Sequence, residues 1–159
     1  MTTVSDLATG DTITEAWTDS VTIALNRVGC AVTRVATQSI PSGTGTFTAI
    51  SWDTESYDSN GFIAPTSTTM TVPSGYDGIY TICGNITWAS SPGTNAIVEV
   101  LYNGSTTVRY PVGAATQLPG GFSATLSMGA TDTIQVRVSQ GSGGAINVTA
   151  FCQMWRVAI

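Results

Sequence analysis

Hydrophobic and polar residues alternate along most of this chain, in short runs separated by turn-forming residues. The clearest example is Met70–Trp88, where one alternating run covers Met70–Val72 and a second covers Tyr80–Trp88. Pro73 ends the first run because it has no N–H to give to a neighbouring strand. The following segment, Ser74–Gly78, contains two glycines that suit a turn. This pattern predicts two half-buried strands joined by a turn.

The same alternation continues on both sides of this segment. Further strands are predicted at Val28–Val32, Phe47–Trp52, Ala96–Tyr102, Val108–Val112, Phe122–Met128, Ile134–Val138 and Ile146–Ile159. Asn103-Gly104 lies between two of them and is a strong hairpin signal. Many short strands with turn signals between them predict an all-β sandwich or barrel.

The N-terminal segment has a different pattern. Between Asp11 and Arg27 apolar residues recur at helical spacing, and Thr12 with Glu15 has the spacing of a capping box. We therefore expect two parts, an N-terminal arm at residues 1–27, helical over part of its length, and an all-β domain at residues 28–159. The arm either packs on its own domain or docks on another protein. In the second case its docking stripe consists of Ile13, Trp17, Val21 and Leu25.

Composition narrows the class of partner. The chain has 159 residues, enough for one domain with a proper core, and is 42% hydrophobic but only 9% charged. Its net charge is −5, and its five basic residues are scattered arginines. Without a basic patch we expect no nucleic-acid partner. No apolar run is long enough to span a membrane, and the first residues do not resemble a secretory signal, so no membrane insertion is expected.

The side chains available for chemistry are few. Histidine is absent, which excludes a Ser–His–Asp triad and any histidine-ligated metal. Cys30, Cys83 and Cys152 lie far apart and form no CxxC pair, so we interpret them as free thiols. We expect no cofactor.

An acidic segment, Trp52–Gly61, offers the remaining chemical possibility. Its clustered carboxylates, Asp53, Glu55 and Asp58, suit a cation such as Ca²⁺, although their spacing is not that of an EF-hand. The stretch from Asp58 to Gly61 is equally typical of an Asx turn. A glycosidase would need two carboxylates about 5 Å or about 6.5–9.5 Å apart. Nothing else in the chain supports catalysis, so we expect that the protein is not an enzyme.

Several of these segments resemble the tumour-necrosis-factor (TNF) and complement globular-head superfamily. Met70–Trp88 resembles its "tVPxxGxY" segment, Trp52–Gly61 its "Fd…yD..G" segment and Val100–Gly104 its "LxxNG" hairpin. Leu126–Val138 is similar to a strand–"xGdxv"–strand unit, with Ala130-Thr131 in place of Gly-Asp. Thr149–Val157 is similar to the closing "tFsGfLl" strand, with Gln153 in place of Gly. The resemblance implies a ten-stranded jelly roll that forms a trimer, with the closing strand between the first strand and the strand after the turn.

A second resemblance concerns the biological setting. An arm such as LATGDTITEAWTDSVTIALNRVG ahead of a "WDTExYD" jelly roll is similar to tailed-bacteriophage virion proteins. It implies a structural protein, a trimeric capsid decoration or head-fibre protein on the particle surface, assembled in the bacterial cytoplasm. The partners would be the major capsid protein or another virion protein. The alternative is the receptor- or glycan-binding tip of a tail fibre or baseplate, where loops such as Ser90–Asn95 or Gly141–Gly144 would bind a host surface glycan.

The closing segment itself predicts an interface. Alternate positions of Ile146–Ile159 are apolar on both faces, and strands that are apolar on both faces are covered on both faces. Because one arm cannot cover two such strands, we expect a subunit interface around a symmetry axis. The predicted trimer interface consists of Phe151, Trp155, Val157, Ile79 and Cys83, with Phe151 or Trp155 near the axis.

Overall fold

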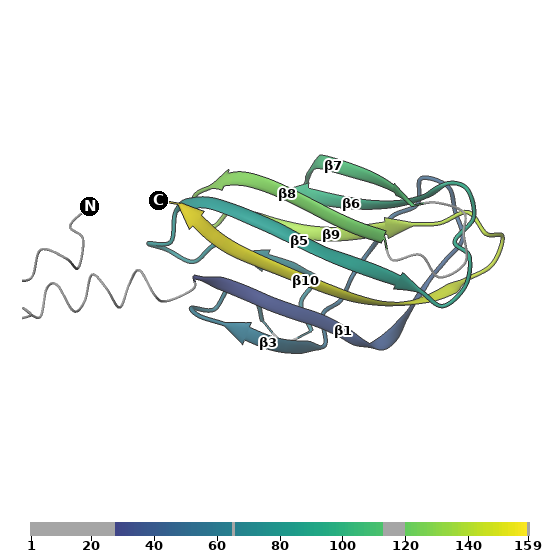
Figure 1. Ribbon diagram of the computed structural model, residues 1–159, viewed down its shortest axis with the longest axis horizontal. Helices are drawn as coiled ribbons and strands as arrows, with labels where there is room; N and C mark the ends of the chain where they lie inside the picture. The colour runs from purple at the N-terminus through teal and green to yellow at the C-terminus, as the bar shows by residue number, and fades with distance from the viewer. Residues whose placement is uncertain (1–27, 65, 113–119, 159) are drawn as a thin grey trace, which may run out of the picture.

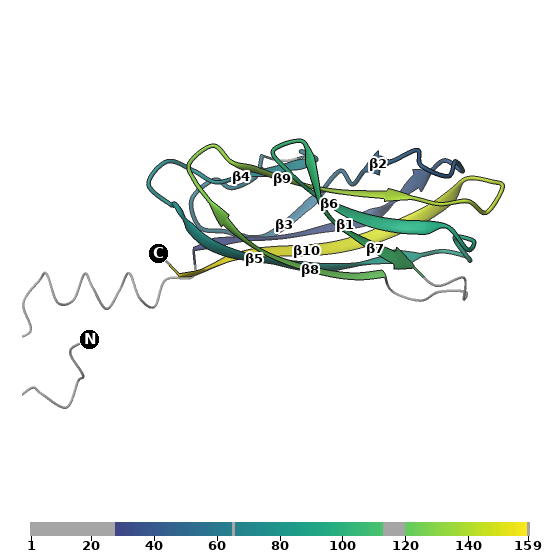
Figure 2. The same ribbon diagram turned by 90° about the horizontal axis from the view of Figure 1, so that it is seen from above.

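The computed structural model describes residues 28–64, 66–112 and 120–158, which form ten strands in two antiparallel sheets packed face to face (Figures 1 and 2). The strands are β1 (Gly29–Ile40), β2 (Thr48–Ala49), β3 (Thr54–Asp58), β4 (Thr69–Thr71), β5 (Gly78–Trp88), β6 (Ala96–Tyr102), β7 (Ser105–Val112), β8 (Gly120–Met128), β9 (Thr133–Ser139) and β10 (Ile146–Ala158). Within these ranges there is no helix, so none that could cross a membrane. The predicted helix at Asp11–Arg27 lies outside the described residues.

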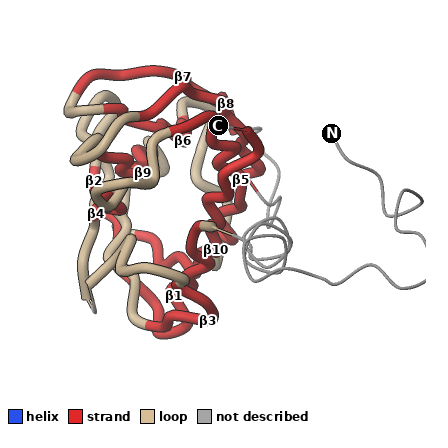
Figure 3. The backbone as a smooth tube through the Cα atoms, turned by 90° about the vertical axis from the view of Figure 1, so that its left-hand side faces the viewer, coloured by secondary structure: helices blue, strands red, loops and turns tan. Residues whose placement is uncertain are grey.

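The strand order confirms the predicted jelly roll. Sheet A runs β3-β1-β10-β5-β8, and sheet B runs β2-β9-β6-β7, with β4 also pairing β9. Viewed end-on, the strands of the two sheets line opposite sides of the sandwich (Figure 3). The closing strand β10 lies between β1 and β5, as the resemblance implied. Its partners along the whole strand are therefore far away in sequence.

The core lies between the sheets, and the Met70–Trp88 segment connects them. Met70 pairs into sheet B through β4, and the chain then turns and enters sheet A as β5. From β5 four side chains on one face are buried in the core, those of Tyr80, Ile82, Ile86 and Trp88. The alternation read from the sequence thus corresponds to one face toward the core and one face away from it.

Two backbone positions depend on glycine. At Gly84 in β5, a Cβ atom would lie 2.1 Å from the backbone oxygen of Phe151 and 2.7 Å from Cζ of Phe122, so only glycine fits between these neighbours. At the β6–β7 turn, Asn103 and Gly104 both have positive φ, 48° and 75°. This confirms the predicted hairpin, because the two-residue turn that matches strand twist needs positive φ at both positions.

The predicted strand at Phe47–Trp52 is wrong over most of its length. Only Thr48–Ala49 pairs, with β9, whereas Ile50 and Trp52 are buried in the connection to β3. Conversely, β3 has no alternating pattern, because its first four residues are exposed on both sides at the edge of sheet A. The first strand is longer than predicted and carries a bulge between Arg34 and Gln38.

Candidate interaction surface

The outward face of sheet A carries the residues predicted for the trimer interface. On β10, Val148, Ala150, Cys152 and Met154 point into the core, so Phe151, Trp155 and Val157 point outward. Ile79 and Cys83 take the outward face of β5, where Cys83 pairs with Gln153 and Thr81 with Trp155. We call Ile79, Cys83, Phe151, Trp155 and Val157 the β5–β10 patch. The structure brings all five onto one face of two neighbouring strands.

This face is unusually apolar for a surface. Among the described residues, the large hydrophobic side chains that remain exposed are Val35, Tyr57, Ile79, Phe151 and Val157, and all five belong to strands of sheet A. Val157 is 59% exposed and Phe151 38%. Tyr57 on β3 packs against Trp155, with ring centroids 5.2 Å apart, and extends the apolar surface to the edge of the sheet. No side chain described for the strands of sheet B is a large hydrophobic group of comparable exposure.

Two hollows lie on the same face. The first is a shallow depression, wide open to solvent, and is lined by Cys83, Asn85, Tyr110, Ser123 and Phe151, among others. The second, about 420 Å³, is lined by Val28, Gln153, Trp155 and Arg156. The surface is therefore uneven, with projecting aromatic side chains beside hollows. A partner of complementary shape can pack closely against such a surface.

The three cysteines lie on the adjacent strands β1, β10 and β5 and are free in the structure. Cys30 and Cys152 face the core and are fully buried. Burial, with smaller contributions from Asp58 and Glu55, raises the pKa of Cys30 to about 12, and burial likewise raises the pKa of Cys152 well above its usual value. Cys83 faces outward, where the Gln153 amide Nε2 lies 3.1 Å from its sulfur. It is thus the one thiol of the three that belongs to the surface.

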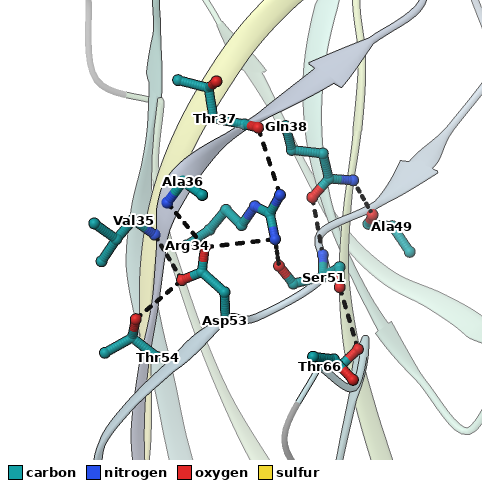
Figure 4. Close-up of polar contacts among 10 residues, drawn as sticks. All are labelled: Arg34, Val35, Ala36, Thr37, Gln38, Ala49, Ser51, Asp53, Thr54 and Thr66. Carbon is teal, nitrogen blue, oxygen red and sulfur yellow. Dashed lines mark hydrogen bonds and ion pairs between the residues drawn. The ribbon is translucent and has the colours of Figure 1, made fainter.

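Two carboxylates of the acidic segment accept hydrogen bonds from backbone N–H groups. The Asp53 carboxylate accepts the N–H groups of Val35 and Ala36, each at 2.8 Å, on the β1 bulge (Figure 4). These bonds, the Val35 N–H first, hold the pKa of Asp53 below its usual value. Asp58 accepts four successive N–H groups, from Asn60 to Ile63, which confirms the Asx-turn interpretation.

Glu55 lies between these two carboxylates in sequence but does not join them. Among the described residues, no group of three or more Asp, Glu, Cys or His side chains is arranged to hold a metal ion. The carboxylates of Asp53 and Asp58 are instead occupied by backbone donors. The geometry thus gives them a structural role in place of the cation site considered from the sequence.

Further hydrogen bonds hold the β1 bulge on the connection between the sheets (Figure 4). The Gln38 amide donates to the carbonyl of Ala49 at 2.8 Å and accepts the Ser51 N–H at 3.0 Å. Arg34 donates to the Ser51 carbonyl at 3.3 Å and pairs with Asp53 at 3.5 Å. Several hydrogen bonds therefore hold the backbone that carries the exposed Val35 side chain.

The outer face of sheet B contains a charged cluster that sequence reasoning missed. Glu99 on β6 is fully buried and accepts hydrogen bonds from Arg109 on β7 and Arg137 on β9, each Nε at 2.8 Å. The Phe47 ring lies against both guanidinium groups, 5.3 and 5.1 Å from its centroid. The sequence held no direct signal, because a regular hairpin at Asn103-Gly104 would place Glu99 opposite Val108, and a register shift between Val100 and Leu101 brings Arg109 there instead. The pairing with Arg137 required the β6–β9 register.

The predicted docking stripe of Ile13, Trp17, Val21 and Leu25 lies outside the described residues. It stays a prediction, as does the boundary between residues 1–27 and 28–159.

Comparison with known proteins identifies the fold. No protein-family model and no curated protein sequence matches the chain. Among solved structures, the globular domain of zebrafish complement 1qA superposes with a TM-score of 0.62 at 10% identity, covering 82% of this chain and 97% of that domain. The PRD1 vertex protein P5 superposes with a TM-score of 0.62 at 14% identity, covering 81% of this chain and 96% of P5. Murine APRIL gives 0.55 at 12% identity, with 79% and 98% covered.

These likenesses confirm the expected fold. The chain is a TNF-like jelly roll, and the same fold occurs in the complement 1qA globular domain, in the PRD1 vertex protein P5 and in APRIL.

Proposed function

We propose that this chain is a structural virion protein of a tailed bacteriophage, a homotrimeric capsid decoration or head-fibre protein. In this proposal the N-terminal arm docks on the major capsid protein or another virion protein, and the jelly roll forms the knob on the particle surface. The role is not enzymatic and needs no cofactor. Assembly takes place in the bacterial cytoplasm.

The observation that carries the proposal is the apolar outer face of sheet A. Burying it against copies of itself removes Phe151, Val157 and Ile79 from water, which is favourable by roughly 25 cal/mol per Å² of apolar surface. A rotational axis brings the same face of each copy together, and the superfamily resemblance implies three copies. The jelly-roll likeness to PRD1 vertex protein P5 supports a place in a virion.

Light scattering on the purified full-length protein tests the oligomer. We expect a mass of three times 16.4 kDa. Phe151→Arg should reduce the mass to that of one chain, because an apolar interface cannot bury an unpaired guanidinium in each copy. Ala130→Arg adds the same charge at an exposed turn between β8 and β9, away from the patch, and should leave the mass unchanged. A wild-type monomer at micromolar concentration would exclude the trimer.

A further inference from the structure

We propose that the outer face of sheet B carries a binding site for a carboxylate-bearing sugar, centred on Arg109 and Arg137. The site lies on the opposite sheet from the β5–β10 patch, so it stays accessible when that patch is covered. It depends on a charge cluster and not on the loops considered from the sequence.

The charges of this cluster do not balance. Two arginines surround one glutamate, so the cluster has one positive charge in excess, in a chain whose net charge is −5. The other ion pair found in the described part of the chain joins Arg34 to Asp53, so no second described carboxylate compensates this cluster. One added carboxylate would bring it to neutrality.

The two guanidinium groups use only part of their hydrogen-bond donors on Glu99. Arg109 donates to Glu99 through Nε, and Arg137 through Nε and one Nη. The other three Nη groups donate to no acceptor among the residues that the structure describes. The Arg109 side chain is 55% exposed and that of Arg137 28%, so these donors are within reach of a ligand. A planar guanidinium with free donors recognises a carboxylate through paired hydrogen bonds.

The burial of Glu99 serves to position the two arginines more than to stabilise the fold. A buried ion pair contributes little net stability, because desolvation of the charges offsets their attraction. What Glu99 and the Phe47 ring do provide is a fixed position for two otherwise flexible side chains. Preorganised groups bind with a smaller loss of conformational entropy. The two arginines of the cluster are thus held in place before a ligand binds, as in a preorganised binding site.

The surroundings favour a sugar over an acidic peptide. Phe47, which precedes β2, adds an aromatic ring beside the arginines. An aromatic ring beside guanidinium donors suits a ligand in which an acid group is attached to a sugar ring.

The test compares two matched ligands by NMR titration of the full-length protein, methyl glucuronoside and methyl glucoside, which differ in the carboxylate. We expect the glucuronoside to shift signals of the β6, β7 and β9 residues in a saturable way and the glucoside not to do so. Arg109→Gln should weaken binding by about tenfold or more, because charge-assisted hydrogen bonds are lost. It should still fold, since Glu99 keeps Arg137. Arg156→Gln, on sheet A, is the control for net charge and should bind normally.

Three outcomes would overturn the proposal. They are the absence of saturable binding, equal binding of both ligands, and glucuronoside binding that Arg109→Gln leaves unchanged in a folded protein. An acidic peptide that binds through Arg109 while the glucuronoside does not would assign the site to a protein partner and would also overturn the sugar. None of these results depends on the oligomeric state, so the site and the trimer are tested separately.

Discussion

Single residues determine how closely the strands of sheet A approach one another. Gly84 is the sharpest case, because the β10 backbone and the Phe122 ring occupy the space where a side chain would begin. The sequence showed a glycine in an alternating strand, which is a signal of close approach. It did not show what approaches, because Phe122 and Phe151 come from strands far away along the chain.

Gly84→Ala should therefore destabilise the protein. The added methyl group would have to displace the Phe151 carbonyl and the Phe122 ring, and overpacking of this kind costs about 1–3 kcal/mol. Denaturant unfolding measures the change. Gly121→Ala on the neighbouring strand, where a Cβ would meet nothing within 4 Å, should be close to neutral. Equal effects of the two substitutions would contradict this account.

Asp132 should make the free energy of unfolding depend on pH in the acidic range. It accepts hydrogen bonds from the Tyr102 hydroxyl at 2.6 Å, the Asn103 amide at 2.7 Å and the Gly129 N–H at 2.7 Å, and these hold its pKa below the usual value. A depressed carboxyl pKa stabilises the fold above the unfolded-state value of about 3.9, and this stability is lost as pH falls through the folded-state pKa.

Thermal unfolding between pH 7 and pH 2.5 measures this contribution. Asp132→Asn should lower stability at pH 7 by about 1 kcal/mol, since solvent weakens hydrogen bonds to a partly exposed carboxylate, and should reduce the loss of stability in acid. Glu55→Gln, an exposed carboxyl on β3, should leave the profile close to wild type. If the stability of Asp132→Asn falls with pH in parallel with that of the wild type, other groups cause the loss of stability in acid.

The reactivity of the Cys83 thiol should show whether the β5–β10 patch is covered by another subunit. In the proposed trimer it is covered, whereas Cys30 and Cys152 are buried in every subunit and have raised pKa values that suppress the reactive thiolate. At neutral pH we expect no thiol of the native trimer to react quickly with a thiol reagent and one per chain to react in monomeric Phe151→Arg. Mass spectrometry identifies the modified peptide. Equal labelling of Cys83 in both proteins would place it outside the interface.

At the scale of elements, alternation predicted the strands that bury one face. Strands β5, β6, β8, β9 and β10 appear at the expected positions within a few residues. Strand β3 was missed because an edge strand exposed on both sides leaves no periodic signal. The Glu99 cluster was missed for another reason, since three strands had to be in register before one buried carboxylate could meet two arginines.

The arm is the element with the most direct test. Deletion of residues 1–27 should leave a folded jelly roll, because the described strands form a core without them. The truncated protein should lose binding to particles that lack the wild-type protein, since the stripe of Ile13, Trp17, Val21 and Leu25 is removed. Sedimentation with such particles measures occupancy, and circular dichroism checks the fold. Full occupancy by the truncated protein would exclude the docking role.

On the scale of the whole molecule, the two outer faces differ in character. Sheet A presents apolar projections and hollows, whereas sheet B presents arginines oriented by a buried carboxylate. The sequence predicted the first face from the two-sided apolar pattern of the closing strand. The second could not be predicted, because the arginines are scattered in sequence and meet only in the folded sheet.

The antiparallel pairing of β1 with β10 also determines where a foreign peptide could be inserted into this fold. Because Gly29 pairs with Trp155, the chain enters β1 and leaves β10 at the same end of the sandwich (Figure 1). The β5–β6 loop lies beyond the other end, where Trp88 pairs with Val148, seven residues and roughly 23 Å along β10 from the Gly29–Trp155 pair. A foreign epitope inserted after the exposed Thr94 would point away from whatever holds the arm, whereas one fused after β10 would crowd the attachment.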